Sequence, residues 1–414
     1  MKKYSKLTIL VLVIIITLST FYLQMGNVTS SFAQYEIKTV EGDESMIENV
    51  VVKGDYYASY VNYEQFKLTK DGTHYLRDEP FLKRLDGYYV SDQVAQLQNG
   101  NRKFMRMKNS EVNTYFETDD LIISAEIPYT RWGTFKGHLE LETYNRQTNE
   151  QNTYEIEAPD LLDYAMVEKM YMNEDKLYIP VINMEYDIDT DEEVTRLSVF
   201  VFDFTEKTLV DSFDVTLSDA NYYSDFTEIF VNDENNPTEM VITGVFIDYE
   251  ELEETTEDEG TPDENEEFRE YVELTVIKKI DLQTNEVSDI EITDGIKNGV
   301  PIAFNGTEII FANAEGNNLV YSTFNIETGE MAEKLKVETN VEFVSMWDFE
   351  GNIIDDRKVY TLINNEYESS ATLVVIDIDT NELLYQGTIE GDSQRRISKD
   401  ESQVYFHTLE VNDL

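Results

Sequence analysis

One short pattern recurs along the chain: an alternating apolar run, a polar turn, and a second alternating run. It occurs in residues 141–156, 199–215, 276–292, 320–337 and 373–389. Four of these turns end in Thr-Asn-Glu or Thr-Gly-Glu. Asn and Gly tolerate the left-handed conformation of tight turns, and a leading Asp or Asn can accept hydrogen bonds from backbone amides two residues on. The pattern therefore predicts β-hairpins, and it accounts for the alternating Asp377 and Asp379 without a metal.

The spacing of these hairpins predicts the architecture. Their first turn residues are 58, 78, 44 and 52 positions apart, and the longest interval contains residues 248–270, where 13 of 23 residues are acidic. Such a segment is typical of a disordered insertion. Without it the period is that of a four-stranded propeller blade. Residues 48–414 therefore predict an all-β β-propeller of about seven blades. Six or eight blades would also fit the length, and tandem β-sandwiches are the alternative fold.

Three further elements follow from local signals. The alternating run at residues 404–411 is predicted to pair with strands near residues 50–63 and so to close the ring. Helices are predicted over residues 91–97, capped by Ser91 and ended near Gly100, and over residues 159–172. The 27 Tyr and 21 Phe, with many β-branched residues, favour strands elsewhere.

The sequence VVIDIDTNE at residues 374–382 resembles the V-I-D-x-x-T hairpin of bacterial β-propeller repeat proteins of the YVTN and quinoprotein-like type. The resemblance covers the five hairpins, roughly a fifth of the chain. It implies a propeller fold and no particular activity. Trp132 and Trp347 are the only tryptophans, so the repeated Trp of quinoprotein blades is missing, and with it any argument for a quinone cofactor.

The N-terminus predicts export. Lys2, Lys3 and Lys6 precede an uncharged, apolar run of 17 residues at 7–23. This length fits a transmembrane helix whose basic flank stays in the cytoplasm. The small residues around Ala33 suit signal peptidase, so cleavage after Ala33 is the alternative. Residues 1–33 are thus a membrane anchor or a signal peptide, residues 34–47 a linker, and the rest extracytoplasmic or secreted.

The charge of the chain limits its partners. With 84 acidic and 32 basic residues, the formal net charge is −52. Such a surface repels nucleic acid and anionic headgroups, so we expect no nucleic-acid partner and membrane contact only through the N-terminal helix. Residues 67–108 are an exception, with nine basic and five acidic residues. This segment either pairs internally with the acidic remainder or forms a contact patch for an acidic polymer or partner.

Metal sites have few candidates. The chain has no cysteine and three histidines, which excludes thiolate sites and makes a His-built zinc site improbable. The alternating carboxylates Asp187, Asp189 and Asp191 are candidate metal ligands, and Ca²⁺ is the cofactor they would take. Their loop fails the EF-hand pattern because Glu192 replaces the required Gly and Ser198 the required Glu. A solvated acidic turn is the alternative reading.

The most site-like segment is residues 127–138. It brings Arg131, Trp132, Lys136 and His138 together with two glycines in a chain that is otherwise poor in Trp and His. Arg and Trp can hold an anion or the face of a sugar ring. These four residues are therefore candidate ligand-binding residues, and a packed connection is the alternative.

The sequence favours binding over catalysis. It contains no Gly-x-Ser-x-Gly, Walker or paired-His motif, and its carboxylates are too numerous to single out a general acid. We therefore predict an exported propeller that binds a protein or cell-envelope component as a scaffold or sensor. The alternative is a metal-dependent propeller hydrolase or lyase with carboxylates at its central channel.

Overall fold

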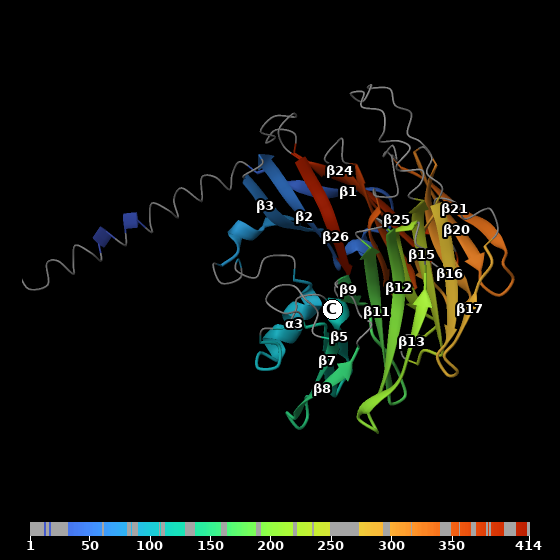
Figure 1. Cartoon of the computed structure of the whole chain (residues 1–414). Helices are drawn as coiled ribbons and strands as arrows, with labels where there is room; N and C mark the ends of the chain where they lie inside the picture. Colours follow the sequence, from blue (N-terminus) through green and yellow to red (C-terminus); the bar gives the residue numbers. More distant parts are fainter. Residues whose placement is uncertain are drawn as a thin grey trace, which may run out of the picture. The chain divides into compact units, whose positions relative to one another are not determined.

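The structure is a computed structural model with two compact units, residues 1–89 with 339–414, and residues 90–338 (Figure 1). It describes residues 12–13, 16–17, 32–59, 62–80, 84, 90–106, 108, 112–128, 137–158, 164–187, 192–217, 222–233, 236–248, 273–292, 299–315, 317–339, 349–355, 357–365, 370–377, 380, 382–392 and 403–411. The described part is dominated by antiparallel strands. This confirms the all-β prediction.

The first unit is built from both ends of the chain. Its two sheets have the strand orders β1-β25-β24-β23-β22 and β26-β2-β3-β4. Their strands are β1 Tyr35–Gly42, β2 Val50–Ser59, β3 Asn62–Thr69, β4 Gly72–Tyr75, β22 Phe349–Asp355, β23 Lys358–Asn365, β24 Ser370–Asp377, β25 Leu383–Gly391 and β26 Gln403–Val411. Two 3₁₀ helices, η1 Glu44–Ile47 and η2 Leu76–Asp78, lie between them.

Strands from the two termini pair in both of these sheets. β26 runs antiparallel to β2, with Val50 opposite Val411 and Tyr57 opposite Gln403. Figure 1 draws the red β26 beside the blue β2. This pairing confirms the prediction that residues 404–411 add to strands near residues 50–63.

The prediction that residues 34–47 form a linker is wrong. β1 pairs with β25, and η1 follows it directly. The segment is ordered because Tyr35 and Ile47 are buried and because the Asp43 side chain caps η1, accepting from the Ser45 amide at 2.9 Å. Its charged residues alternate with these apolar ones and occupy exposed positions.

One apolar core joins the two sheets of the first unit. Alternate residues of β2 and β26 point into it, and β23, β24 and β25 supply the opposite side. Its aromatic members include Phe66, which lies 5.6 Å from the Phe406 ring in an edge-to-face arrangement. This core occupies one face of the β26-β2-β3-β4 sheet. Successive side chains of a strand point to opposite faces, so the residues that alternate with the core residues lie on the other face of the sheet.

The second unit contains four sheets. Their orders are β5-β6-β7-β8, β10-β11-β12-β13 with β9 also paired to β11, β14-β15-β16-β17 and β18-β19-β20-β21. The strands are β5 Tyr115–Glu117, β6 Leu121–Glu126, β7 His138–Asn145, β8 Gln151–Glu157, β9 Tyr164–Val167, β10 Tyr171–Asn173, β11 Lys176–Asp187, β12 Glu192–Asp203, β13 Thr208–Thr216, β14 Tyr222–Val231, β15 Glu239–Asp248, β16 Glu273–Asp281, β17 Glu286–Asp289, β18 Val300–Phe304, β19 Glu308–Glu315, β20 Asn318–Asn325 and β21 Met331–Glu338.

Successive sheets of the second unit share apolar cores. On β12, Phe200 and Phe202 pack with the sheet before it, whereas Val199 and Val201 pack with the sheet after it. The β14–β17 sheet likewise contributes to a core on each of its faces. Sheets with two apolar faces are stable only when each face is covered, and consecutive stacking achieves this.

One of the two helix predictions is confirmed, and the other is wrong. α3 Asp92–Gly100 begins at Ser91, whose hydroxyl accepts from the Val94 amide at 3.2 Å, so the first predicted helix is confirmed. A short 3₁₀ helix, η3 Val112–Thr114, follows it. The second predicted helix, residues 159–172, is wrong, because β9 lies within it and pairs with β11. The available strand edge outweighs the helical spacing of the apolar residues in that segment.

The turn chemistry is confirmed. In four hairpins the first turn residue accepts hydrogen bonds from the amides two and three positions on, at 2.8–3.0 Å; these residues are Asn145, Asp203, Asp281 and Asn325. The residue four positions on has a positive φ of 57–69° in each case: Asn149, Lys207, Asn285 and Gly329. In the fifth hairpin, Asp377 accepts from the Thr380 amide at 2.8 Å.

The described strands form six sheets, where we predicted about seven blades with six or eight also fitting the length. Two features lengthen the chain per sheet. β11 and β12 have 12 residues each, about twice the usual strand length. Among the described residues between η2 and η3, α3 is present and no strand is found. The predicted acidic insertion, residues 248–270, lies outside the described residues except for its first residue, where β15 ends.

Almost all of the predicted N-terminal membrane or signal segment also lies outside the described residues. Six of its residues are described, four of them in the apolar run, where Thr17 donates to the carbonyl of Val13 at 2.9 Å, a helical spacing. Within the described part of the chain, no helix is long and apolar enough to cross a membrane.

Candidate functional site

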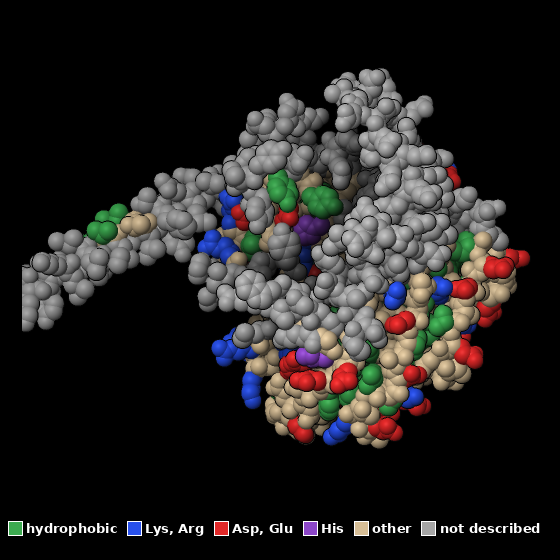
Figure 2. All heavy atoms as spheres, viewed as in Figure 1, with side chains coloured by type: hydrophobic (Ala, Val, Ile, Leu, Met, Phe, Trp, Pro, Cys, Tyr) green, Lys and Arg blue, Asp and Glu red, His purple; other side chains and the backbone are tan. Residues whose placement is uncertain are grey.

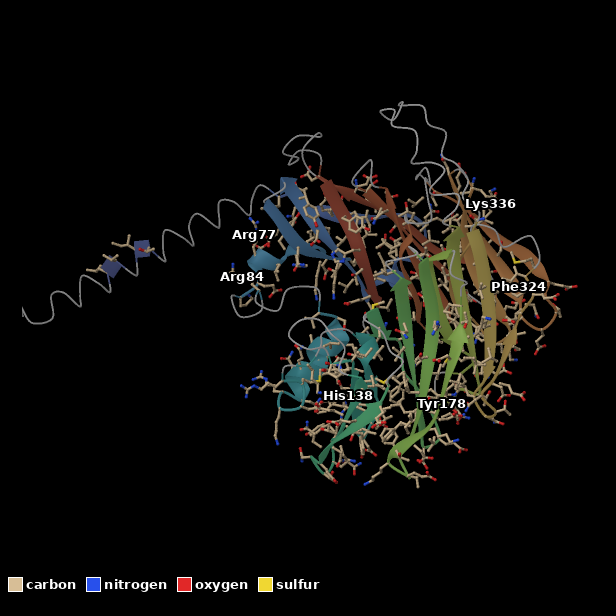
Figure 3. All side chains as sticks on the ribbon, viewed as in Figure 1. Arg77, Arg84, His138, Tyr178, Phe324 and Lys336 are labelled. Atoms are coloured by element: carbon tan, nitrogen blue, oxygen red, sulfur yellow. The ribbon has the colours of Figure 1, made fainter. Side chains whose placement is uncertain are left out.

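Of the four predicted ligand-binding residues, the structure describes His138 alone. His138 opens β7, opposite Glu157, and its side chain is half-buried (Figure 3). Arg131, Trp132 and Lys136 lie outside the described residues. The ligand-binding interpretation of this loop therefore stays a prediction.

The predicted metal loop joins β11 to β12. Asp187 is the last residue of β11 and stands opposite Glu192, the first residue of β12. β11 and β12 are thus antiparallel neighbours, and the metal-loop and acidic-turn interpretations both stay predictions. Asp189 and Asp191 lie outside the described residues. Among the residues that are described, no three His, Asp or Glu side chains are grouped to hold a metal ion.

A different cluster of charged side chains stands out in the first unit. It occupies the face of the β26-β2-β3-β4 sheet opposite the apolar core. We call it the ionic face, and its members are Lys53, Asp55, Tyr57, Gln65, Tyr405, His407 and Glu410. The ionic face arises because successive side chains of a strand point to opposite faces of the sheet. In β2, Val52, Gly54 and Tyr56 alternate with the residues of the ionic face.

A β-bulge brings His407 to this face. The β2–β26 register shifts between Lys53, which is opposite Thr408, and Gly54, which is opposite Phe406. The extra residue of β26 at this shift is His407. Bulges commonly redirect a side chain near functional sites. The imidazole Nδ1 lies 2.8 Å from the Thr408 hydroxyl, and the ring stacks beside Tyr405 with centroids 6.5 Å apart.

One end of the ionic face is a buried ion pair. Lys53 Nζ donates to Glu410 Oε1 at 2.5 Å, and the two side chains are 2% and 16% exposed. Desolvating two charges costs several kcal/mol, which their attraction offsets only in good geometry. Glu410 Oε2 is also buried and has no hydrogen-bond partner among the described residues. It is an available acceptor at the edge of the pair.

The other end combines a carboxylate with aromatic side chains. Asp55 is 5% exposed, and its Oδ2 lies 3.8 Å from His407 Nε2 and 3.4 Å from the Tyr57 hydroxyl, which donates to it. Across the sheet, Asp55 stands between Gln65 and Tyr405. Tyr57 and Tyr405 are 38% and 39% exposed. This end of the ionic face is therefore accessible to solvent, whereas the Lys53 end is buried.

This arrangement suits recognition of a polar ligand. It offers carboxylate acceptors, an imidazole, an amide and two exposed aromatic rings on one rigid sheet. Ligand sites typically combine aromatic walls with a few convergent polar groups of this kind. These residues are not singled out by the sequence because 344 positions separate the end of β2, at Ser59, from the start of β26, at Gln403. Combining the predicted pairing of the two strands with the alternation of VVVKGDYY and QVYFHTLEV would have indicated the face.

The second unit contains one strongly perturbed carboxyl. Burial raises the pKa of Glu228 on β14 to about 7, the Glu168 carboxylate also raises it, and Lys169 lowers it. The Glu228 side chain is half-buried on a strand whose next residue, Ile229, faces a core. Perturbed carboxyls occur at functional sites and in structural clusters alike. No further ligand-like feature accompanies Glu228 within the described residues.

The chain matches no family model and no curated protein sequence. It is similar to solved structures, at low identity. The uncharacterized protein lmo1340 of Listeria monocytogenes EGD-e is 9% identical, with 67% of each chain covered and a TM-score of 0.36. Synechocystis apocarotenoid oxygenase is 9% identical, with 87% of this chain and 96% of that chain covered and a TM-score of 0.36. TolB from Acinetobacter baumannii is 12% identical, with 83% and 80% covered and a TM-score of 0.26. None of these similarities carries an assignment of function.

Proposed function

We propose that the protein is a six-bladed β-propeller of the YVTN-like kind, held at the cell membrane with an extracytoplasmic domain, and that it binds a cell-envelope component. The propeller is supported by six antiparallel sheets and by cores shared between successive sheets in the second unit. It is also supported by the addition of the C-terminal strand β26 to β2, since joining the two ends of the chain is how a propeller leaves no open edge.

Tethering at the membrane, rather than secretion, is supported by the residues that follow the apolar N-terminal run. Phe32 and Ala33 are 1% and 0% exposed and belong to the core of the first unit. The Phe32 ring packs against Tyr56 and Tyr75 and under the Arg77 guanidinium, 3.9 Å away. Cleavage after Ala33 would remove both residues from that core. A retained apolar segment is a membrane anchor.

The main observation that supports the proposed binding function is the ionic face. Burying Lys53 and Asp55, with Glu410 mostly covered beside them, costs folding free energy, and groups of this kind occur at functional sites as well as in structural ion-pair networks. Glu410 Oε2 has no hydrogen-bond partner among the described residues, and the exposed Tyr57 and Tyr405 rings offer flat apolar faces. A hydroxyl-rich ligand, such as an envelope glycan, supplies both donors and an apolar ring face.

The test is co-sedimentation of the full chain, in detergent, with insoluble cell-wall glycan. We expect the wild type to pellet with the glycan, and Asp55→Asn and Tyr405→Ala each to weaken binding by about tenfold. Asp71→Asn, an exposed carboxylate of the same unit, is the matched control and should leave binding unchanged. Unchanged thermal midpoints would establish that the variants fold. Absence of pelleting, or equal pelleting of all variants, would reject this function.

A further inference from the structure

Two sets of cations in the locally basic segment, residues 67–108, have different roles. One set pairs internally: Lys70 contacts Glu48 at 3.4 Å, and Lys108 contacts Glu142 at 3.1 Å. Lys108 is also nearly buried and lies 4.8 Å above the Phe104 ring. These side chains satisfy the internal-pairing expectation. The second set consists of Arg102, Lys103 and Arg106, which we call the basic turn.

The basic turn is held rigidly at the end of α3. The amides of Phe104 and Met105 both donate to the Asn101 carbonyl, at 2.9 and 3.0 Å. Between the three cations, Phe104 and Met105 are 2% and 4% exposed and pack against α3 and the β5–β8 sheet. Phe104 additionally stacks on Tyr144, with centroids 5.5 Å apart. Two anchored side chains therefore fix the backbone that carries the cations.

The three cations themselves are exposed. In the part of the chain that the structure describes, no carboxylate lies within ion-pair distance of Arg102, Lys103 or Arg106. Figure 2 shows Lys and Arg side chains gathered at the side of the molecule where Figure 1 draws α3. In a chain with a net charge of −52, three cations within five residues, with no carboxylate of the described residues in ion-pair distance, form a local exception.

We infer that the basic turn is an interaction surface for a short acidic segment of a partner protein. Guanidinium groups bind carboxylates in a bidentate manner, and a rigid turn loses little entropy on binding. The size of the patch selects the kind of partner. At physiological salt, charges interact over about 8 Å, so a compact run of carboxylates meets only the cations. A membrane or a long polyanion would extend past the patch and meet the acidic remainder.

The test uses the full chain in detergent and a fluorescein-labelled tetraglutamate peptide as the probe, with fluorescence anisotropy at about 20 mM and about 150 mM salt. We expect saturable binding that weakens with salt. The double substitution Arg102→Gln with Arg106→Gln should lower the affinity at least about tenfold. Lys176→Gln is the matched control, an exposed lysine of the same unit at the start of β11.

Each possible result of this binding experiment either supports the inference or overturns it. Loss of binding in the double variant, with the Lys176→Gln protein unaffected, supports the inference. No binding of the peptide, or equal binding by all three proteins, overturns it. Sedimentation with anionic vesicles, in preference to the peptide, would show that the turn faces a lipid surface and also overturns it. This surface lies in the second unit, so its failure leaves the glycan-binding test at the ionic face unaffected.

Discussion

The Tyr75 hydroxyl donates a 2.6 Å hydrogen bond to the backbone carbonyl of Ala33, and both residues are buried in the core of the first unit. The next carbonyl, of Gln34, accepts from the Asp392 amide at 2.8 Å. The peptide bond that a signal peptidase would cut thus lies between two anchored carbonyls. The N-terminal segment joins the first unit at this point. The core of that unit is incomplete without Phe32 and Ala33.

The first prediction concerns Phe32. Phe32→Ala should lower the free energy of unfolding by about 3–5 kcal/mol, because it leaves a cavity among Tyr56, Tyr75 and the Arg77 side chain. Urea denaturation of the detergent-solubilised chain measures it. Val40→Ala, at a position 53% exposed on β1, is the control and should change little. Equal stability of the two variants would mean that Phe32 is not part of the core in solution.

The second prediction concerns the buried ion pair. Lys53→Met or Glu410→Leu alone should cost about 3–5 kcal/mol, since each leaves a buried charge without its partner. The double variant Lys53→Met with Glu410→Leu should recover most of this loss. A double-mutant cycle of unfolding free energies measures the coupling. Additive effects of the two single changes would show that the residues do not interact.

The third prediction concerns the turn chemistry. Asn325→Ala removes the acceptor of the Glu327 and Thr328 amides, both at 3.0 Å, and should destabilise the second unit by about 1 kcal/mol. Asn325→Asp should be tolerated, because Asp203 and Asp281 make the same contacts in their own turns. Thermal midpoints of the two variants test this. If both substitutions had the same effect, the side-chain acceptor would not be what stabilises the turn.

The fourth prediction is a pH dependence. The pKa of Glu228 is raised from about 4.5 to about 7, so the protonated form is favoured in the folded state. Its contribution to stability is present below pH 4.5 and is lost as the pH rises through 7. Glu228→Gln should therefore match the wild type near pH 4 and exceed it near pH 8, by up to about 3 kcal/mol. Denaturation curves at the two pH values measure the difference, and parallel pH profiles would contradict the raised pKa.

The sequence predicted the parts of the fold that local chemistry determines. The turns at Asn145 and Asp281 depend on side chains that bond adjacent amides, and Ser91 marks the start of α3 by the same chemistry. The pairing of β26 with β2 followed from strand alternation. The turns and the start of α3 need no knowledge of distant contacts, whereas the β26–β2 pairing was expected because a propeller closes its ring.

The remaining features depend on contacts between distant residues. The strand β1 is not predicted, because its charged residues obscure the apolar alternation and its strand character depends on pairing with β25. The strand β9 is not predicted either, because it forms by pairing with the edge of β11, which local helix signals do not report. The ionic face needed the register of two strands and the bulge at His407, and bulges leave no clear signature in a sequence.

The most direct test of the account is the N-terminal residue of the mature chain purified from host membranes, determined by intact mass and N-terminal peptide mapping. A chain that begins upstream of Phe32 and fractionates with the membrane is the predicted result, because Phe32 and Ala33 are core residues. A mature chain that begins at Gln34, folded and released into the medium, would contradict it.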